Sequence, residues 1–540
     1  MNGKDSPAAA PSLLGGLRRP DAYPHEVGNV EVIETHISWV LLAGAYAYKI
    51  KKPVALGFAD FTTLEKRRHF CEQELELNRR LAPQLYLDVV EICGSVDAPR
   101  IAGTGPVFEY AVRMRRFPQD ALASHLLAAG GLSPSLVDRL AVRVAKFHDS
   151  VPRATPELPY GTTAGVLADA WDNFDQIAEL LPGACGSPPF SRLRDWTERE
   201  FMVRYTELRE RRAAAMIREC HGDLHLRNIV LLDGELVPFD CIEFNAGLRW
   251  IDPVSEAAFL FMDLLDRGAD ALAWRFLSSY FEASGDYPGL AVLRFYAVYR
   301  AMVRAKVHLI RSRQLEESDP EAARLLSAYE SYLELAQRFT RQAMPGIVLM
   351  RGLSGSGKST IALSLVGKIR GLRIRSDVER KRLYGLPADA LSGSAVASGL
   401  YGQEPTEATY GRLAGIARAV VRAGYTAIVD AAFLLRRQRA QLRQVALQLG
   451  APIAVLDVQA PLAMLRERIT ARSRDGRDPA EARIDVLEHQ LATLEPVADD
   501  ERLPVVTLDG SKAPDGASVR AIARALGRDC PSPTELRISA

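Results

Sequence analysis

The chain has 540 residues, of which 48% are hydrophobic and 25% charged, values that suit a globular protein with a sizeable core. Its formal net charge is only +1, from 68 basic and 67 acidic residues, which argues against a protein that coats nucleic acid. The six cysteines form no CxxC pair, so neither a zinc site nor a disulfide framework is indicated, and we expect a reducing, cytoplasmic compartment. No apolar run approaches the roughly 18 residues of a membrane span.

The chain changes character along its length. A disordered tail is expected over 1–25, followed by a strand-rich segment over 26–115 and a mostly helical segment over 116–340. From 345 to 530 short buried strands alternate with helices, which is typical of an α/β domain with a parallel sheet, and a second tail covers 531–540. The two halves share no pattern, so we interpret the chain as a fusion and not a duplication.

The strand-rich segment begins with short alternating apolar runs over 30–55, which predict strands joined by a tight turn near Gly44. A helix is expected next. Thr62 and Glu65 fit a capping box at its start, and the helical pattern continues to about Leu81.

The motif "HGDLHLRN" interrupts the helical segment and carries two polar residues at a suggestive spacing, Asp223 and Asn228. It is followed by "NIVLLDGELVPFD", in which Asp233-Gly234 is a strong hairpin signal between two apolar runs. The hairpin is expected to bring Asp240 back beside Asn228, where the two side chains could share a magnesium ion.

These residues point to phosphoryl transfer, which needs metal-held phosphates, a cation on the non-transferred phosphates and a base that orients the acceptor hydroxyl. Kinases of the eukaryotic type add a Lys–Glu pair in their small lobe. Here Lys49, in "AYK", is the expected lysine and Glu74 its partner on the helix. Lys51 shares the strand face of Lys49, and Glu72 and Glu76 flank Glu74, so these alternatives stay open.

"HGDLHLRN" followed by "FD" resembles the aminoglycoside phosphotransferase family over roughly residues 30–310. The resemblance implies an α+β, protein-kinase-like, two-lobed fold, with 26–115 as the small lobe and 116–340 as the helical large lobe. It implies adenine near "EYAVRM" and one role for each residue: the catalytic base Asp223, the metal ligands Asn228 and Asp240, and the ATP-binding pair Lys49 and Glu74.

Other residues of this half have supporting roles or depart from the family pattern. His221 is expected to brace its loop, and Asp252 and Glu256 are expected to be structural. The loop "LLAGAYAY", which would cover the phosphates, contains little glycine, and Cys241 follows Asp240 where kinases have an apolar residue. A weakened grip on the nucleotide is therefore an open alternative.

The second half opens with "GLSGSGKST", which matches the P-loop motif and lies between a buried strand and a helix. Its glycines let backbone N–H groups form an anion cradle at a helix N-terminus. Lys358 is expected to reach the outer phosphates during catalysis, and Ser359 to offer its hydroxyl to Mg²⁺. The expected nucleotide-binding residues are Gly352, Ser354, Gly355, Ser356, Gly357, Lys358, Ser359 and Thr360.

Two carboxylates of this half follow strands. Asp377, after "RIRS", is a candidate general base at the ligand edge of the sheet, with a helix N-cap as the alternative. Asp430 ends "TAIVD" and is a candidate magnesium ligand, with an ordinary loop residue as the alternative. The candidate lid is arginine-rich: Arg472 is the expected phosphate-binding residue, and the other members are Arg468, Arg474 and Arg477.

Besides the P-loop, "SDVERKRLYG" and "VDAAF" resemble the small P-loop kinases, a group that includes polynucleotide kinase, zeta toxin, chloramphenicol phosphotransferase and gluconate kinase-like proteins. The order of the two halves resembles a bacterial fusion family described as bifunctional aminoglycoside phosphotransferase and ATP-binding protein. This resemblance implies kinase folds and leaves the metabolite open.

The leading hypothesis is a bifunctional kinase in which each half uses ATP and Mg²⁺ to phosphorylate a hydroxyl group of a small molecule. A second hypothesis is a single active half regulated by nucleotide binding in the other. A third, a nucleic-acid end kinase, is weakened by the balanced charge, since phosphate tracking normally needs a basic surface.

Overall fold

A computed structural model describes residues 10–56, 59–316, 318–341, 344–388, 390, 399–475 and 483–528. They form two compact units. The first contains the described parts of Met1–Leu140, Phe147–Thr162 and Arg212–Glu256, and the second those of Ala141–Lys146, Thr163–Arg211 and Ala257–Ala540.

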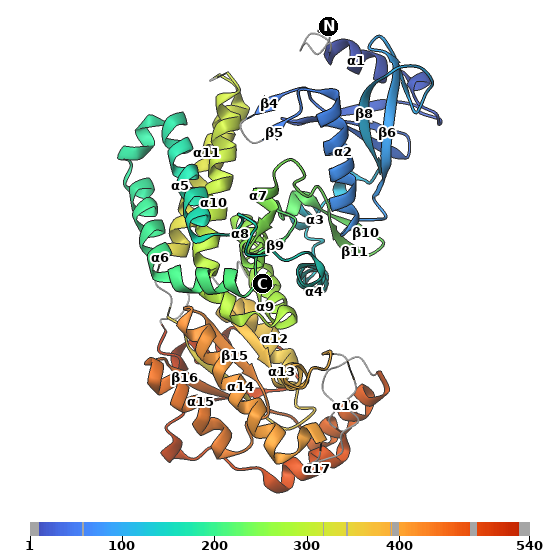
Figure 1. Ribbon diagram of the computed structural model, residues 1–540. Coiled ribbons are helices and arrows are strands. Elements are labelled where there is room, and N and C mark those ends of the chain that lie inside the picture. The colour runs from blue at the N-terminus through green and yellow to red at the C-terminus, as the bar shows by residue number, and fades with distance from the viewer. Residues whose placement is uncertain are drawn as a thin grey trace. The chain divides into compact units, whose positions relative to one another are not determined.

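A six-stranded antiparallel sheet dominates the first unit, with the strand order β1-β2-β3-β8-β6-β7 (Figure 1). The turn between β2 and β3 contains Gly44 in the left-handed region at φ 59°, as the alternating pattern predicts. The strands are β1 (Val30–Glu34), β2 (Ser38–Ala43), β3 (Tyr46–Lys51), β6 (Tyr86–Ser95), β7 (Ala98–Ile101) and β8 (Val107–Arg115). The short strands β4 (Ala55–Leu56) and β5 (Ala59–Asp60) form a separate pair.

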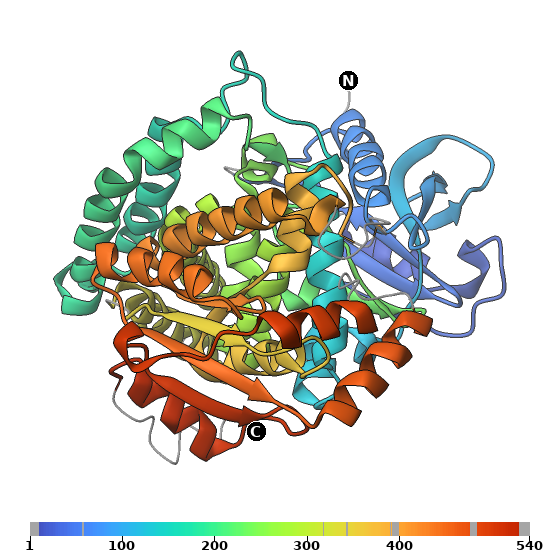
Figure 2. The same cartoon turned by 90° about the horizontal axis from the view of Figure 1, so that it is seen from below.

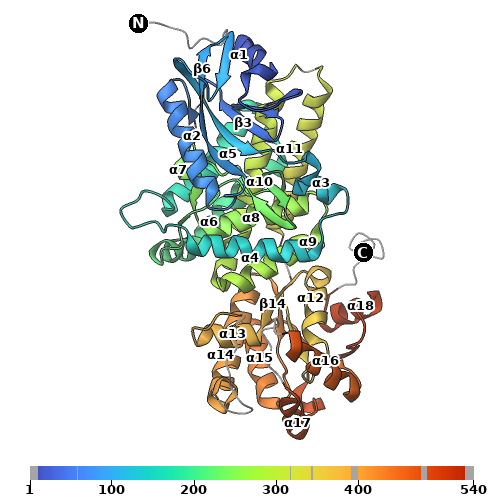
Figure 3. The same cartoon turned by 90° about the vertical axis from the view of Figure 1, so that its right-hand side faces the viewer.

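Helix α2 (Leu64–Arg79) lies along β6 and β8 of this sheet (Figure 3). Its N-cap is Thr63, whose hydroxyl accepts a hydrogen bond from the Lys66 N–H. The predicted capping box at Thr62 is therefore wrong by one residue, because the Thr62 hydroxyl instead donates to Asp60. Glu74 lies on the buried face of this helix.

The rest of the first unit carries the "HGDLHLRN" motif. The hairpin between β10 and β11 is present, with Leu232 paired to Glu235 and both Asp233 and Gly234 at positive φ, as a type I′ turn requires. The other elements of this unit are α3 (Ala123–Ala128), β9 (Arg218–Glu219), β10 (Ile229–Leu232), β11 (Glu235–Pro238), α7 (Ala246–Arg249), β12 (Trp250–Ile251) and α1 (Ala10–Leu17), which lies within the segment expected to be a disordered tail and packs on β7. Helices α4 (Pro134–Ser150) and α8 (Pro253–Asp266) belong partly to this unit and partly to the second.

The second unit combines long helices with a five-stranded parallel sheet. Its helices before the sheet are α5 (Thr163–Leu180), α6 (Pro188–Ala213), α9 (Asp270–Ser284), α10 (Leu290–Arg313) and α11 (Pro320–Thr340). Gly285, at φ 71°, ends α9 in the left-handed conformation that glycine adopts without strain.

The parallel sheet has the strand order β14-β15-β13-β16-β17, with helices on both faces (Figure 2). Strand β13 is central and buried at every position, which explains its continuous apolar sequence. The strands are β13 (Ile347–Arg351), β14 (Gly371–Arg375), β15 (Thr426–Asp430), β16 (Ile453–Gln459) and β17 (Val505–Asp509). The helices are α12 (Lys358–Ile369), α13 (Ser376–Leu383), α14 (Gln403–Arg422), α15 (Arg436–Leu449), α16 (Leu462–Asp475), α17 (Ile484–Thr493) and α18 (Gly516–Ala525).

These elements confirm the expected fold classes: a protein-kinase-like α+β fold in the N-terminal half and an α/β P-loop fold in the C-terminal half. Within the described ranges, no helix has both the length and the apolar character needed to cross a membrane.

Candidate functional site

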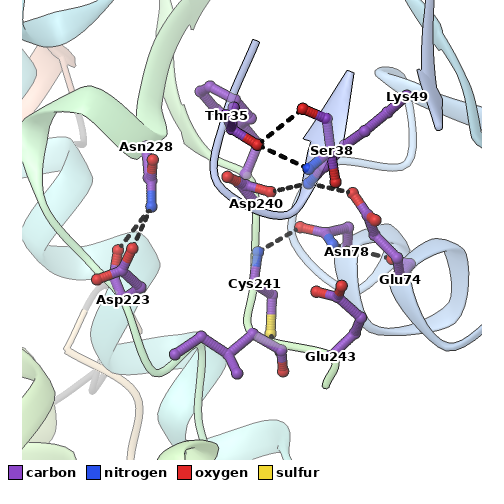
Figure 4. Close-up of polar contacts among 12 residues, drawn as sticks. Thr35, Ser38, Lys49, Glu74, Asn78, Asp223, Asn228, Asp240, Cys241 and Glu243 are labelled. Atoms are coloured by element: carbon purple, nitrogen blue, oxygen red, sulfur yellow. Dashed lines mark hydrogen bonds and ion pairs between the residues drawn. The ribbon is translucent and has the colours of Figure 1, made fainter. Parts of the chain in front are cut away.

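The first candidate site is organised around Lys49, which lies on the central strand β3. Its backbone pairs with Val40 on one side and Val112 on the other, which fixes its position in the sheet. Its Nζ lies 2.8 Å from Glu74 Oε1 and 2.5 Å from Asp240 Oδ1 (Figure 4). The structure thus brings together the lysine, the helix glutamate and the second aspartate that the sequence predicts.

Lys51 contacts the same helix glutamate from the same strand face. Its Nζ lies 2.7 Å from Glu74 Oε2 and also donates to Glu243, and its side chain is fully buried. Glu72 forms an exposed pair with Arg68, 2.9 Å away, so the competing helix position faces solvent. Both lysines therefore bind Glu74, but the contact with Asp240 belongs to Lys49.

The charges of this network determine its pKa values. Burial alone would raise the pKa of Glu74, but the ammonium groups of Lys49 and Lys51 outweigh it and lower that pKa to about 2. Burial alone would lower the pKa of Lys49, but Asp240 and Glu74 raise it well above its ordinary value. The pair is therefore fully ionised at neutral pH, which leaves Lys49 positively charged toward an anionic ligand.

Glu243 was missed by the sequence reasoning. It lies three residues after Asp240 in "FDCIEF" and has a pKa raised by burial and lowered in part by Lys51. The sequence signal for such a residue was Lys51, the second lysine on the same face of β3. A buried lysine needs a carboxylate partner of its own, which implies one more acidic residue nearby.

The "HGDLHLRN" loop places Asp223 and Asn228 in contact (Figure 4). The Asn228 Nδ2 donates to the Asp223 carbonyl at 3.0 Å and to its Oδ2 at 2.9 Å. His225 Nε2 lies 3.3 Å from the same carboxylate oxygen. His221 is buried, its Nε2 lies 2.8 Å from the Phe239 carbonyl oxygen, and burial lowers its pKa, which suits the bracing role expected for it.

The hairpin returns the chain to this loop. The Phe239 N–H donates to the Asn228 carbonyl at 2.9 Å. This bond holds the backbone just before Asp240 against the loop. Asp240 has a positive φ of 64°, and its N–H donates to the Tyr86 hydroxyl at 3.1 Å. Its side chain is 41% exposed, which leaves carboxylate oxygen available to a ligand.

Glu256, which follows the loop in the chain, supports the loop, and Asp252 supports the start of α8. The Gly222 N–H donates to Glu256 Oε1 at 2.6 Å, and His148 Nε2 lies 2.7 Å from Glu256 Oε2. Asp252 accepts from the Val254 N–H at 2.9 Å at the start of α8. The side chains of His148, Cys220 and Glu256 place possible metal-ligand atoms within 4.8 Å of one another. Both Glu256 oxygens already have hydrogen-bond partners, so we interpret this cluster as structural and not as a metal site.

The second candidate site is the P-loop between β13 and α12. Gly355 and Gly357 have φ values of 82° and 95°. A Cβ at Gly355 would lie 2.8 Å from the Leu465 carbonyl oxygen, and one at Gly357 would lie 2.6 Å from that of Gly510. Glycine fits these positions without a clash, and glycines at positive φ are what a cradle of backbone N–H groups requires.

Lys358 and Ser354 of the P-loop form hydrogen bonds within the protein. The Lys358 Nζ donates to the Leu353 carbonyl at 2.8 Å, and the Ser354 N–H donates to Gln490 Oε1 at 2.8 Å. Gln490 lies on α17 and was not predicted, because its sequence context "LEHQLA" is that of an ordinary helix. Its amide oxygen stands where an oxygen of an anionic ligand would accept the Ser354 N–H.

The polar groups around the P-loop fit a magnesium nucleotide. Ser356 Oγ and Asp430 Oδ2 are buried, and neither atom has a hydrogen-bond partner in the part of the chain that the structure describes. Asp430 ends β15 next to β13, where its register partner is Met350. A buried carboxylate oxygen without a donor, at the end of the strand next to the one that leads into the P-loop, is a suitable ligand for Mg²⁺ with its waters.

Asp377 lies in the first turn of α13, directly after β14. The N-cap of this helix is Arg375, so the alternative interpretation of Asp377 as the cap is wrong. The Asp377 Oδ1 accepts from Arg380 at 3.2 Å, and the Arg380 guanidinium lies 4.6 Å from the ring centroid of Tyr401. Asp377 is thus held at the carboxyl edge of the sheet, where open α/β sheets bind ligands.

The predicted lid falls partly outside the structure. Arg468, on α16, donates to the Gly510 carbonyl at 3.0 Å and to that of Gly355 at 3.3 Å, so it braces the P-loop. The side chains of Arg472 and Arg474, and Arg477 as a whole, lie outside the described residues. The role predicted for Arg472 stays a prediction.

A protein-kinase-like half followed by a P-loop half defines the class of this chain: a fusion of two kinase-type folds. A family model described as an AAA domain matches residues 347–497. The chain belongs to the same family as the uncharacterized protein Rv2004c of Mycobacterium tuberculosis (strain ATCC 25618 / H37Rv), to which it is 31% identical over 450 residues. The alignment covers 83% of this chain and 87% of the relative, and the uncharacterized protein Mb2027c of Mycobacterium bovis matches equally well.

Solved structures of kinases are similar to each half. An ethanolamine kinase of Plasmodium vivax is 10% identical, with a TM-score of 0.36, over 57% of this chain and 81% of its own. A sugar kinase of Janibacter sp. HTCC2649 is 21% identical, with a TM-score of 0.26, over 36% of this chain and 99% of its own.

Proposed function

We propose that the chain is a bifunctional ATP-dependent phosphotransferase. Each half would transfer the γ-phosphoryl group of ATP to a hydroxyl of a small molecule, such as an aminoglycoside-like or sugar-like compound or another metabolite. The observation that supports this most is that each unit contains its own lysine and carboxylates around its own loop: Lys49, Asp240 and Asp223 in one, and Lys358 and Asp430 in the other. The proposed setting is the cytoplasm.

In the first site, bound Mg-ATP would supply the phosphoryl group and the metal charge that stabilises its transfer. Lys49, held by Glu74, would bind the phosphates, and Asp240 and Asn228 would hold the metal. Asp223 would accept the proton of the substrate hydroxyl. Its contact with Asn228 fixes the carboxylate, and its side chain is 36% exposed, so it remains accessible to a substrate.

In the second site, the P-loop amides and Lys358 would hold the phosphates, and Ser359 and Asp430 would hold Mg²⁺. Phosphate binding would require Lys358 to leave the Leu353 carbonyl and Gln490 to leave the Ser354 N–H. Asp377 would orient the acceptor hydroxyl, because its carboxylate is fixed at the end of the sheet by Arg380.

The test is phosphorylation of a metabolite library by the full chain with Mg-ATP, compared with Asp223→Asn and Lys358→Ala. Each variant should lose one product and keep the other, because the two sites share no residue. Loss of an oxyanion-stabilising or base residue typically lowers the rate by about 10²–10⁴-fold. The proposal fails if both variants retain every activity of the unmodified chain.

A second candidate function is a single active half regulated by the other. The favouring observation is the turn between Ala43 and Tyr46, which is too short to form a glycine-rich cover over phosphates in the first site. Under this alternative Asp223→Asn would remove no product of its own, and the chain would still bind nucleotide at both sites. Recovery of two separate products excludes it.

A further inference from the structure

Helix α9 covers the edge of the P-loop sheet. Strand β14 is an edge strand, bonded within the sheet only to β15. Its Arg373 N–H, which no strand pairs, donates instead to the Ser278 hydroxyl of α9 at 3.0 Å. Helix α9 therefore satisfies a backbone donor that an edge strand would otherwise leave open.

The packing between α9 and the P-loop half is close. A Cβ at Gly367, on α12, would lie 2.8 Å from the Ala271 Cα of α9, so the two helices approach through their small residues. Trp274 of α9 packs against the apolar core formed by β13, α12 and α18, and its ring centroid lies 6.0 Å from that of Tyr425. Figure 3 shows α9 beside α12 and β14, so the helix is part of this core.

Arg373 connects α9 to the P-loop itself. Its guanidinium binds both carboxylate oxygens of Glu282 at 2.9 and 3.2 Å, and the two side chains are only 10% and 16% exposed. Its Nη1 also donates to the Ser359 carbonyl at 3.4 Å. A bidentate Arg–carboxylate pair fixes the orientation of the guanidinium, so Glu282 determines where the third bond can be made.

The end of α9 also holds the helix that carries Asp377. Arg382 of α13 donates to the Glu282 carbonyl at 2.5 Å and to the Ala283 carbonyl at 3.3 Å. These two carbonyls lie in the last turn of α9, where intrahelical donors are lacking. The same turn of α9 therefore contacts α13, which carries Asp377, and is linked to Ser359 through Arg373.

We propose that Arg373 is a positioning residue of the second site, held by Glu282, and that it fixes the backbone of Ser359 so that the serine hydroxyl can bind Mg²⁺. This inference rests on the proposed function, because it assumes that Ser359 binds a metal–nucleotide complex. It makes α9, which precedes the P-loop half in the sequence, a required part of the P-loop site.

The test uses Glu282→Gln and Arg373→Lys in the full chain. Glu282→Gln removes the charge that orients the guanidinium, and Arg373→Lys keeps a charge but cannot bind two oxygens and a carbonyl at once. The measurement is binding of a fluorescent ADP analogue against Mg²⁺ concentration, counting only the component that Lys358→Ala abolishes. Each variant should raise the Mg²⁺ midpoint, the Mg²⁺ concentration that gives half-maximal binding of the analogue, about tenfold, which is the typical effect of losing a residue that supports a metal ligand. Binding of the analogue without Mg²⁺ should change less.

Asp270→Asn is the matched control. Asp270 begins α9 and pairs with Arg370, at the end of α12, at 3.3 Å, so it also joins α9 to the P-loop half without a contact to Ser359. Its variant should keep the Mg²⁺ midpoint of the unmodified chain. If Glu282→Gln does not fold, Arg373→Lys decides, because it retains the ion pair.

The outcomes separate two failures. An unchanged Mg²⁺ midpoint in folded Arg373→Lys, or an equal shift in Asp270→Asn, overturns the positioning role while the nucleotide site stands. An unmodified chain with no Lys358-dependent binding overturns the proposed function of the second site, and this inference with it.

Discussion

Glu256 shows how single side chains set the geometry of the first site. Its two carboxylate oxygens bind the Gly222 N–H and His148, so it fixes the residue that precedes Asp223 in the "HGDLHLRN" loop. Burial alone would raise its pKa, but the hydrogen bond and charge of His148, together with His221 and the Gly222 N–H, lower it to about 2. Its ionised form is therefore strongly preferred in the folded chain.

The depressed pKa predicts a pH-dependent contribution of Glu256 to stability. The ionised group stabilises the fold above the ordinary value of 4.5, and this contribution is lost as the pH falls toward about 2. Glu256→Gln should therefore lower the free energy of unfolding by roughly 3 kcal/mol at neutral pH. The difference from the unmodified chain should shrink steadily in urea unfolding measured below pH 4.5.

Glu72→Gln provides the comparison for this measurement. Glu72 pairs with Arg68 on the exposed face of α2, where both side chains are more than half exposed. Its variant should stay within about 0.5 kcal/mol of the unmodified chain at every pH. A difference for Glu256→Gln that does not change with pH would contradict the role given to its charge.

Residues of the first site differ in how far the sequence predicts them. Asp223 and Asn228 are five positions apart in one loop, so their contact follows from local spacing. Lys51 and Glu243 are separated by 192 positions, and which lysine binds which carboxylate depends on packing. The sequence therefore names the chemical groups of this site but leaves open how Lys49 and Lys51 divide their partners.

At the scale of elements, the P-loop turn makes the sharpest demand on residue type. Gly357→Ala would place a Cβ against the Gly510 carbonyl, at a φ of 95° that alanine rarely adopts. We expect this variant to weaken nucleotide binding at the second site by more than about tenfold, because the strain of roughly 1–3 kcal/mol falls on the amides that are proposed to bind phosphate. The first-site product should be unaffected.

The matched glycine variant is Gly415→Ala in the interior of α14. An added Cβ there meets no atom within 4 Å, and the helix conformation suits alanine. This variant should raise the free energy of unfolding by about 0.5–1 kcal/mol and leave both binding sites intact. Equal loss of nucleotide binding in the two variants would show that the turn geometry is not the cause.

Elements with local signals were predictable and those with distant partners were not. The Asp233-Gly234 hairpin and the strand before the P-loop follow from turn chemistry and from a continuous apolar run. The start of α2 was misplaced by one residue, because Thr62 and Thr63 are equally good caps by type. The cover of β14 by α9 has no sequence signal, because an amphipathic helix does not specify which surface it contacts.

For the whole molecule, the two proposed nucleotide sites predict a simple stoichiometry. A titration with a non-hydrolysable ATP analogue and Mg²⁺ should fill both sites of the unmodified chain. Lys358→Ala and Asp240→Asn should each halve the bound amount, because each variant removes a phosphate or metal contact of one unit only. Equilibrium dialysis measures this directly. Equal saturation of all three chains would contradict two separate sites.

The edge of the P-loop sheet has a consequence for how the chain can be divided. If the segment that begins at β13 were produced by itself, β14 would lose the Ser278 hydroxyl, and the apolar surface beneath Trp274 would face water. A bare strand edge next to an apolar patch is a template on which further copies can add, strand to strand. The truncated segment should therefore self-associate, whereas one that begins at α9 should stay monodisperse.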